Sequence, residues 1–163
     1  MCSPPATQVL EFFVSAVNGA VKRATEIASQ LGAKRAVILP VSAPFHSALM
    51  MPAQEKLAKD LENVQFSDLR FPLVTNVDAD TTQKGEEARD ALVRQVSMPV
   101  RWEESVRLMI DEGVNTFVEV GPGRVLTGLL RQIERSVAAL NIEDEKSLST
   151  TLEKIAAAKA DAA

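Results

Sequence analysis

Apolar residues recur along this chain at helical spacing in some segments and as short continuous runs in others. Between residues 18 and 32 they fall on one face of a helix that Asn18 would cap and Gly32 would end. The same spacing predicts further helices, with inward-facing positions at 53–64 and 88–96 and with spans of 103–112 and 125–136.

Short apolar runs predict strands between these helices. They lie at 8–16, 34–39, 69–77, 115–120 and 137–142, and Pro72 predicts an edge or a bend inside the third, before a polar loop at 78–82. Because strands and helices alternate, the pattern favours an α/β architecture with some parallel pairing. From Ser147 the sequence predicts a short helix, and we expect its alanine-rich end at 156–163 to fray.

Length and composition describe one ordinary globular domain. The chain has 163 residues, of which 46% are hydrophobic and 25% charged, which suffices for a sizeable core. Its net charge of -4 is spread along the sequence, and it has one tryptophan and no tyrosine. Without a basic face or an aromatic stacking platform, we expect no nucleic-acid partner.

The few reactive side chains limit the compartment and the chemistry. The single cysteine, Cys2, cannot form an internal disulfide, and its spacing from the single histidine argues against a metal site. No apolar run approaches the roughly 20 residues that cross a bilayer, and the first residues lack the charged start of a signal peptide. We therefore expect a cytoplasmic protein without a membrane partner.

The only histidine, His46, lies in a loop between the strand that Pro40 ends and a helix with Pro52 in its first turn. Loops of this kind often display reactive side chains. A histidine with an ordinary pKa of about 6.5 can accept and return a proton at neutral pH. A lone histidine is nevertheless more often structural or solvated, so this pattern alone leaves both interpretations open.

Other polar features allow either chemistry or plain structure. The segment Gly-Pro-Gly-Arg at 121–124 turns a strand into a helix whose amides could face an anion, but it lacks the spacing of a phosphate-binding loop. A plain turn is favoured there. Asn76 and Asp78 end a strand, where they would line a crevice or cap a loop. The helical arginines have acidic neighbours, which predicts mostly solvated faces with weak intrahelical ion pairs.

Five segments follow one another in the order of a known family. They read Ser-Ala-Pro-Phe-His-Ser-Ala-Leu-Met at 42–50, Asn-Val-Asp at 76–78, Arg-Asp-Ala-Leu-Val-Arg-Gln at 89–95, Pro-Val-Arg-Trp at 99–102 and Glu-Val-Gly-Pro-Gly-Arg-Val-Leu at 119–126. Together they resemble the C-terminal half of bacterial malonyl-CoA:acyl-carrier-protein transacylases. The resemblance runs from about residue 18 to residue 155, and five motifs in order make it strong.

The resemblance implies a fold more specific than the α/β class. The family has an α/β-hydrolase-like acyltransferase body with an inserted ferredoxin-like subdomain. Residues 1–40 would be the end of that subdomain, residues 41–155 the C-terminal part of the body, and residues 156–163 a frayed tail. Half of a parallel sheet would then be absent, which predicts exposed apolar strand surface and self-association through the exposed sheet edge.

The resemblance also implies transfer of a malonyl group from malonyl-CoA to acyl carrier protein in fatty acid biosynthesis, without a cofactor. In the family a serine attacks the thioester, and the histidine that matches His46 removes its proton and later activates the carrier thiol. The backbone carbonyl of Gln95 would orient this histidine. Asn76 would lie near the same site.

The sequence departs from the family at the nucleophile. It contains no Gly-x-Ser-x-Gly segment, and Ser42 and Ser47 do not lie in such an elbow. The oxyanion-hole donors and the malonate-binding arginine belong to the family's N-terminal half, and the first seven residues match poorly, so we expect a truncation or fragment that is inactive alone. Alternatives are a subunit that another chain completes, a non-catalytic partner-binding remnant, and an acyltransferase piece of a polyketide synthase.

Overall fold

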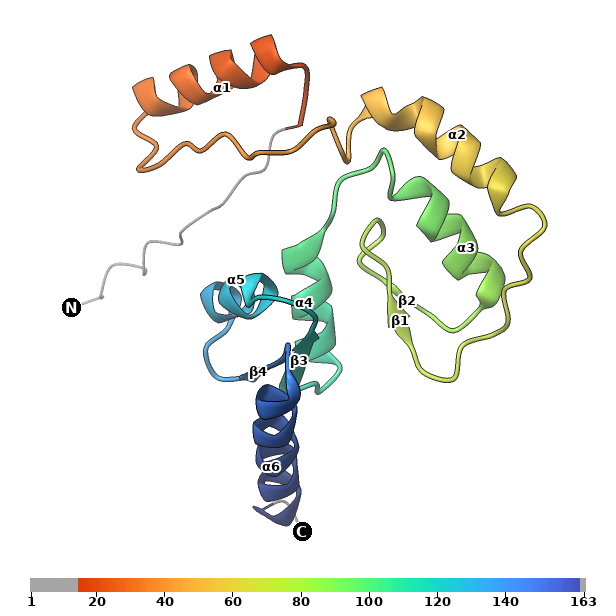
Figure 1. Cartoon of the computed structure of the whole chain (residues 1–163), viewed down its shortest axis with the longest axis vertical. Coiled ribbons are helices and arrows are strands. Elements are labelled where there is room, and N and C mark those ends of the chain that lie inside the picture. The colour runs from red at the N-terminus through yellow and green to blue at the C-terminus, as the bar shows by residue number, and fades with distance from the viewer. Residues whose placement is uncertain (1–14, 162–163) are drawn as a thin grey trace. The chain divides into compact units, whose positions relative to one another are not determined.

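The chain forms two compact units, divided between Ser105 and Val106. A computed structural model describes residues 15–161 (Figure 1). Unit 1 holds α1 (Asn18–Gln30), the 3-10 turn η1 (Ala48–Met50), α2 (Met51–Asp60), β1 (Leu73–Val74), β2 (Thr81–Thr82) and α3 (Gly85–Arg94). α4 (Trp102–Asp111) crosses the division, and unit 2 continues with β3 (Thr116–Val120), α5 (Val125–Ile133), β4 (Ala138–Ile142) and α6 (Glu145–Asp161). The mixed α/β class is confirmed, and no helix in the described part of the chain has the length and apolar character that crossing a membrane requires.

α1 forms where the apolar spacing predicts the first helix. Val17, rather than Asn18, is its N-cap, and the carbonyl of Val17 accepts hydrogen bonds from the amides of Ala20 and Val21 at 2.9 and 3.1 Å. The helix ends before Gly32, whose φ of +88° is a left-handed conformation that glycine adopts without steric cost. No residue of α1 is buried; on its apolar stripe Val21, Ala24 and Ala28 are half-buried, whereas Ile27 is exposed.

The strand predicted at 34–39 is absent, and that prediction is wrong. The segment has no regular structure, and Val37, Ile38 and Leu39 are all exposed. An extended segment becomes a strand only when a neighbour takes up its backbone hydrogen bonds, and no strand of the described residues pairs with this one. The strand predicted at 8–16 lies outside the described residues except for its last two, which are not in a strand.

α2 and α3 pack against each other, and the start of α3 is fixed by a close backbone approach. A Cβ on Gly85 would lie 2.6 Å from the carbonyl oxygen of Phe66, so only glycine fits at this position. Asp68 holds the same helix end, because its Oδ1 accepts a hydrogen bond from the Gly85 amide at 3.1 Å. α3 therefore begins at a position determined by residues that precede it by many positions in the chain.

The strand predicted at 69–77 is much shorter in the structure. Only β1 is a strand, and it pairs antiparallel with β2, which lies in the segment predicted to be a polar loop. Pro72 directly precedes β1 and has no backbone donor for a ladder. The amide of Ala79 donates to the carbonyl of Thr75 at 2.9 Å, and the left-handed φ of Ala79, +51°, reverses the chain.

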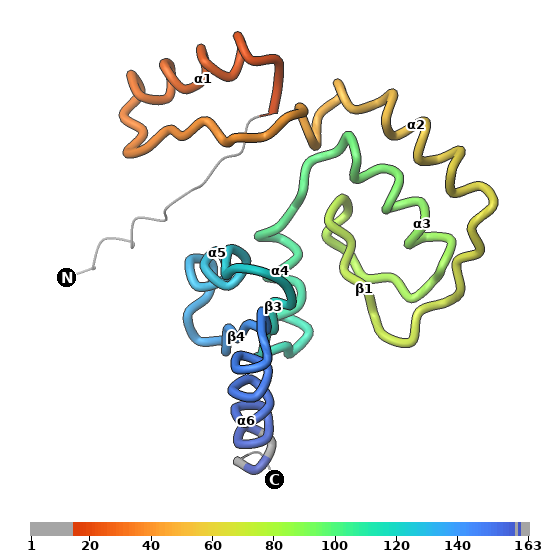
Figure 2. The backbone as a smooth tube through the Cα atoms, viewed as in Figure 1, coloured from red at the N-terminus to blue at the C-terminus, as the bar shows by residue number. Residues whose placement is uncertain are grey.

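Unit 2 is a strand–helix–strand arrangement followed by a long helix. β3 and β4 pair in parallel, from Thr116 opposite Ala138 to Val120 opposite Ile142, as the alternation of elements predicts. α5 packs on both strands, and α6 packs on β4 (Figure 2). α6 continues through the segment from residue 156 to Asp161, which was expected to fray, because the alanines there favour helix.

Few apolar side chains are buried within the described residues. The buried set consists of Val77, Ala91, Val106 and Leu130. By contrast, Val120 at the end of β3 is 76% exposed and Val125 at the start of α5 is 71% exposed. A chain of this length ordinarily buries a larger core, so the expectation of a sizeable core is wrong for the described residues. The predicted exposed apolar surface is present.

Candidate functional site

His46 lies in the irregular loop before η1, in an uncommon backbone conformation. Its φ of +57° is left-handed, which costs a residue with a Cβ roughly 1–2 kcal/mol. The hydroxyl of Ser47 donates to the carbonyl of Pro44 at 2.7 Å and holds the loop locally. Strained conformations of this kind persist only where the surrounding structure determines them, and they cluster at functional sites. The loop conformation therefore marks His46 as a candidate.

The imidazole of His46 contacts the C-terminal end of α3. Its Nδ1 lies 2.9 Å from the backbone carbonyl oxygen of Gln95, the C-cap residue of that helix. The last carbonyls of a helix have no intrahelical donor, so this oxygen is free to accept. Because a carbonyl only accepts, the proton of the contact belongs to Nδ1, and the neutral ring keeps a lone pair on Nε2. The contact thus makes Nε2 the basic nitrogen.

Asn76 reaches the same end of α3. Its Nδ2 donates to Oε1 of Gln95 at 3.2 Å, and its backbone carbonyl accepts from the amide of Arg101 at 2.8 Å. The structure therefore brings together the three residues named from the sequence, His46, Gln95 and Asn76, from separate segments of unit 1. Their catalytic and supporting roles stay predictions.

A further ion pair, which sequence reasoning missed, joins the turn after β1 to α3. Nη1 and Nη2 of Arg94 each lie 2.7 Å from a carboxylate oxygen of Asp78, and its Nε lies 2.6 Å from Asp90. The sequence predicts mainly intrahelical pairs for the helical arginines, as with Asp90, but Asp78 is 16 residues away. The sequence contains one hint of this pair. Asp78 lies two residues after Asn76, and Arg94 directly precedes Gln95, so both belong to the motifs that contain the predicted site residues.

This ion pair favours the charged form of both partners. The hydrogen bonds from Arg94 lower the pKa of the Asp78 carboxyl below its usual 3.8, although desolvation opposes them. The same bonds raise the pKa of Arg94. The two side chains are 40% and 38% exposed, so water screens their attraction. What matters most is the bidentate geometry of the pair, because two parallel hydrogen bonds fix the orientation of the Arg94 guanidinium as well as its distance from Asp78.

An open hollow of about 400 Å³ adjoins the ion pair. It is lined by Thr75, Asp78, Asp80, Thr81, Thr82, Glu86, Glu87, Asp90 and Arg94. Carboxylates outnumber the single arginine, so the hollow repels a negatively charged ligand. Within residues 15–161, no group of three or more His, Cys, Asp and Glu side chains is arranged to hold a metal ion. We therefore do not place an anionic substrate in this hollow.

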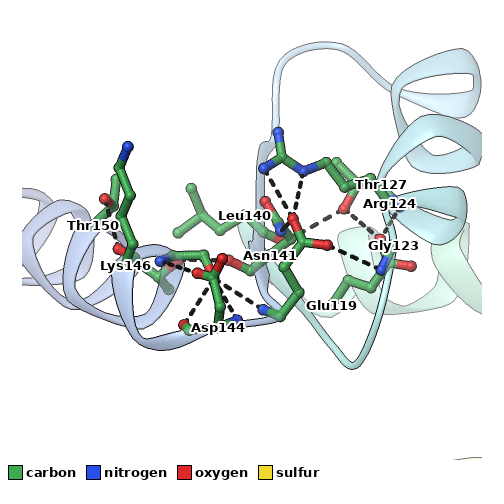
Figure 3. A network of polar contacts seen from close by, with 12 residues as sticks. Glu119, Gly123, Arg124, Thr127, Leu140, Asn141, Asp144, Lys146 and Thr150 are labelled. Atoms are coloured by element: carbon green, nitrogen blue, oxygen red, sulfur yellow. Dashed lines mark hydrogen bonds and ion pairs between the residues drawn. The ribbon is translucent and has the colours of Figure 1, made fainter.

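In unit 2, the turn at 121–123 is held by the chain's own carboxylates (Figure 3). Glu119 accepts hydrogen bonds from the amide and the hydroxyl of Thr127 at 2.8 and 2.7 Å, and these bonds lower the pKa of Glu119. Glu143 accepts from the amide of Gly123 at 3.1 Å. Since carboxylates of the chain already occupy amides around the start of α5, a structural turn is favoured over an anion site.

Comparisons with known proteins give the site a context. No family model matches the chain. Malonyl CoA-acyl carrier protein transacylase of Bacillus subtilis (strain 168) is 38% identical over 145 residues, which cover 89% of this chain and 46% of that protein. The protein of the same name from Escherichia coli (strain K12) is 45% identical over 134 residues, which cover 82% and 43%. A solved complex of a type II PKS acyl-carrier protein with its malonyl-transacylase matches with a TM-score of 0.80 and 47% identity, over 84% of this chain and 44% of that chain.

These matches define the chain first as a relative of enzymes that act on acyl carrier protein. More closely, in sequence and in fold, it is a homologue of part of the malonyl CoA-acyl carrier protein transacylases, and the resemblance drawn from the motifs is confirmed. The chain spans less than half the length of these relatives, with shares of 43% to 46%. These shares fit a match to about half of each relative's chain.

Proposed function

We propose that this chain supplies the base of an acyltransferase site that moves a malonyl group from malonyl-CoA to acyl carrier protein. The observation that carries the proposal is the 2.9 Å contact between His46 Nδ1 and the Gln95 carbonyl, which leaves Nε2 free to accept a proton. The names of the homologues and the solved complex with an acyl-carrier protein support the choice of donor and acceptor.

The proposed reaction consists of two transfers, and neither needs a cofactor. Nε2 of His46 takes the proton of a serine hydroxyl while the serine oxygen attacks the thioester carbonyl, and the imidazolium returns this proton to the departing CoA sulfur. His46 then takes the proton of the carrier thiol, whose sulfur attacks the acyl-serine ester, and the serine oxygen leaves with that proton. The serine belongs to a Gly-x-Ser-x-Gly segment that lies outside this sequence.

The same proposal extends to the fold. Residues 41–155 form the C-terminal part of an α/β-hydrolase-like acyltransferase body, and residues 1–40 form the end of a ferredoxin-like subdomain. The similarity to part of a malonyl-transacylase, with a TM-score of 0.80 over 84% of this chain, supports the assignment to an acyltransferase of this kind. The exposed Val120 and Val125 also support it, because a larger body would cover them.

A second candidate is the same transfer in polyketide synthesis. The structure with 47% identity contains a type II PKS acyl-carrier protein. The chemistry at His46 would be unchanged, and only the accepting carrier protein would differ. Competition between the two kinds of carrier for malonyl transfer distinguishes these candidates.

The decisive experiment is a chimera in which this chain replaces the matching part of the Escherichia coli relative, to which it is 45% identical. We expect the chimera to transfer malonyl to acyl carrier protein, and His46→Ala to lower the rate at least a thousandfold, on the order of losses seen for catalytic bases. Ser42→Ala is the matched control, because Ser42 is exposed and lies four residues before His46 in the same loop, so this variant should keep its rate. A His46→Ala chimera that keeps its rate would refute the assignment of the base.

The chain alone provides a second test. After incubation with malonyl-CoA, intact-mass spectrometry is expected to show no malonyl adduct. An adduct that disappears in His46→Ala would mean that this chain contains its own nucleophile, contrary to the proposal. Equal binding of acyl carrier protein by the unaltered chain and His46→Ala, together with an inactive chimera, would favour a non-catalytic binding role.

A further inference from the structure

Gln95 can orient His46 only while the end of α3 stays in place, and an ion pair outside the predicted site holds that end. Gln95 directly follows Arg94, the last residue of α3. Both terminal nitrogens of Arg94 bind the carboxylate of Asp78, each at 2.7 Å. A bidentate pair restricts the orientation of the guanidinium more than a single contact does. The pair thus fastens the helix end to the turn after β1.

Two further sets of contacts hold that turn. Within the turn, the Asp78 amide lies 3.4 Å from the hydroxyl of Thr75. Arg101, which directly precedes α4, donates from Nη1 to the Asp78 carbonyl at 2.6 Å and from its amide to the Asn76 carbonyl at 2.8 Å. Asn76, which contacts the side chain of Gln95, therefore lies in a segment that Asp78 helps to fix.

We infer that Asp78 and Arg94 are positioning residues for His46, because their ion pair holds the Gln95 carbonyl where His46 Nδ1–H donates to it. The observed contacts connect the pair to the imidazole through Gln95 and Asn76 rather than directly. The catalytic consequence rests on the proposed function, whereas the state of the imidazole can be measured without any substrate.

The test uses the fact that His46 is the only histidine, so that NMR of imidazole nitrogens reports on this residue alone. Measured at a pH where the ring is neutral, the shifts of its two nitrogens show which one carries the proton. We expect the Nδ1–H form in the unaltered chain and a tautomer mixture in Asp78→Asn and in Arg94→Lys. Lysine keeps the positive charge but cannot form two parallel hydrogen bonds to one carboxylate, so Arg94→Lys separates the effect of the bidentate geometry from that of the charge.

Asp90→Asn is the matched control. It removes the other carboxylate partner of Arg94, at 2.6 Å, and leaves the pair with Asp78, so the Nδ1–H form should persist. Fluorescence of Trp102, the only tryptophan, checks that each variant is folded. Should Asp78→Asn be unfolded, the result for Arg94→Lys decides the test. An unchanged tautomer in folded Arg94→Lys, or an equal loss in Asp90→Asn, would overturn the inference.

The chimera separates this inference from the proposed function. There, Asp78→Asn and Arg94→Lys are expected to lower kcat about ten- to a hundredfold, as misplacement of a catalytic group does, with KM for malonyl-CoA nearly unchanged. An inactive chimera, combined with an Nδ1–H form that this chain shows alone and its variants lose, would refute the function only. An active chimera whose variants keep kcat, combined with an unchanged tautomer in the same variants of this chain alone, would refute only the positioning role.

Discussion

The Nδ1 of His46 and the backbone carbonyl oxygen of Gln95 lie 2.9 Å apart, although 49 residues separate them in the sequence. The contact uses the main chain of Gln95, so it does not depend on the side chain at that position. The Gln95 side chain makes a separate contact, with Asn76 at 3.2 Å. Substitutions can therefore test the two interactions one at a time.

Gln95→Ala should have a small effect on malonyl transfer by the chimera. The substitution removes the hydrogen bond to Asn76 and leaves the carbonyl that faces His46. One neutral hydrogen bond contributes about 0.5–1.5 kcal/mol, which limits the loss of kcat to roughly tenfold. Asn76→Ala is the partner variant and has the same limit. A loss in Gln95→Ala as large as that in His46→Ala would show that the side chain, rather than the carbonyl, orients the imidazole.

The sequence predicted helices better than strands, for a physical reason. A helix satisfies its backbone hydrogen bonds locally, so the apolar spacing placed α1 and α5 within a few residues of their observed bounds. A strand needs a neighbour that the local sequence does not contain. Residues 34–39 have a strand-like composition but no partner, and of residues 69–77 only Leu73–Val74 pairs.

Only the part of the candidate site that lies in the family motifs, which is His46, Gln95 and Asn76, was predictable from the sequence. An acidic residue four positions before an arginine is visible in a sequence, as with Asp90 and Arg94. The pair of Asp78 with Arg94 spans 16 residues and forms only once the turn and the helix are folded. The left-handed φ of His46 also had only a weak signal, since histidine is one of several polar residues enriched in that region.

Gly85→Ala should destabilise the chain. The new Cβ would lie 2.6 and 2.7 Å from the backbone oxygens of Phe66 and Ser67, which cannot rotate away, so we expect the free energy of unfolding to fall by about 1–3 kcal/mol. Gly128→Ala in α5 is the control, because nothing lies within 4 Å of its Cβ position, and it should gain about 0.5–1 kcal/mol. Urea unfolding followed by circular dichroism measures both. Equal stability of the two variants would contradict the close approach at Gly85.

The ion pair of Asp78 should make stability fall in acid. Arg94 lowers the pKa of Asp78 below 3.8, so below that pH the unfolded chain binds a proton more readily than the folded chain. The stabilisation is therefore complete above the unfolded pKa and is lost as the pH falls through the lowered folded pKa.

Comparison with Asp78→Asn isolates this contribution from other carboxyls with lowered pKa values, such as Glu119 and Asp144. The difference in the free energy of unfolding between the two proteins should be constant from about pH 6 to 8 and should shrink below about pH 4. Thermal unfolding at a series of pH values measures it. A difference independent of pH would show that Asp78 does not act through its charge.

The exposed edge of the sheet in unit 2 should cause self-association. Among the described residues β3 pairs only with β4, so each strand presents one unpaired edge, and Val120 at the end of β3 is 76% exposed. We expect sedimentation to show concentration-dependent association that Val120→Lys weakens, because a lysine at an edge opposes strand pairing. Val125→Lys is the control, since Val125 is 71% exposed but lies in α5. Both substitutions should change the free energy of unfolding by less than about 0.5 kcal/mol.

Equal weakening of the association by both substitutions would indicate general apolar contact instead of edge pairing. No weakening by either would show that this surface does not cause association.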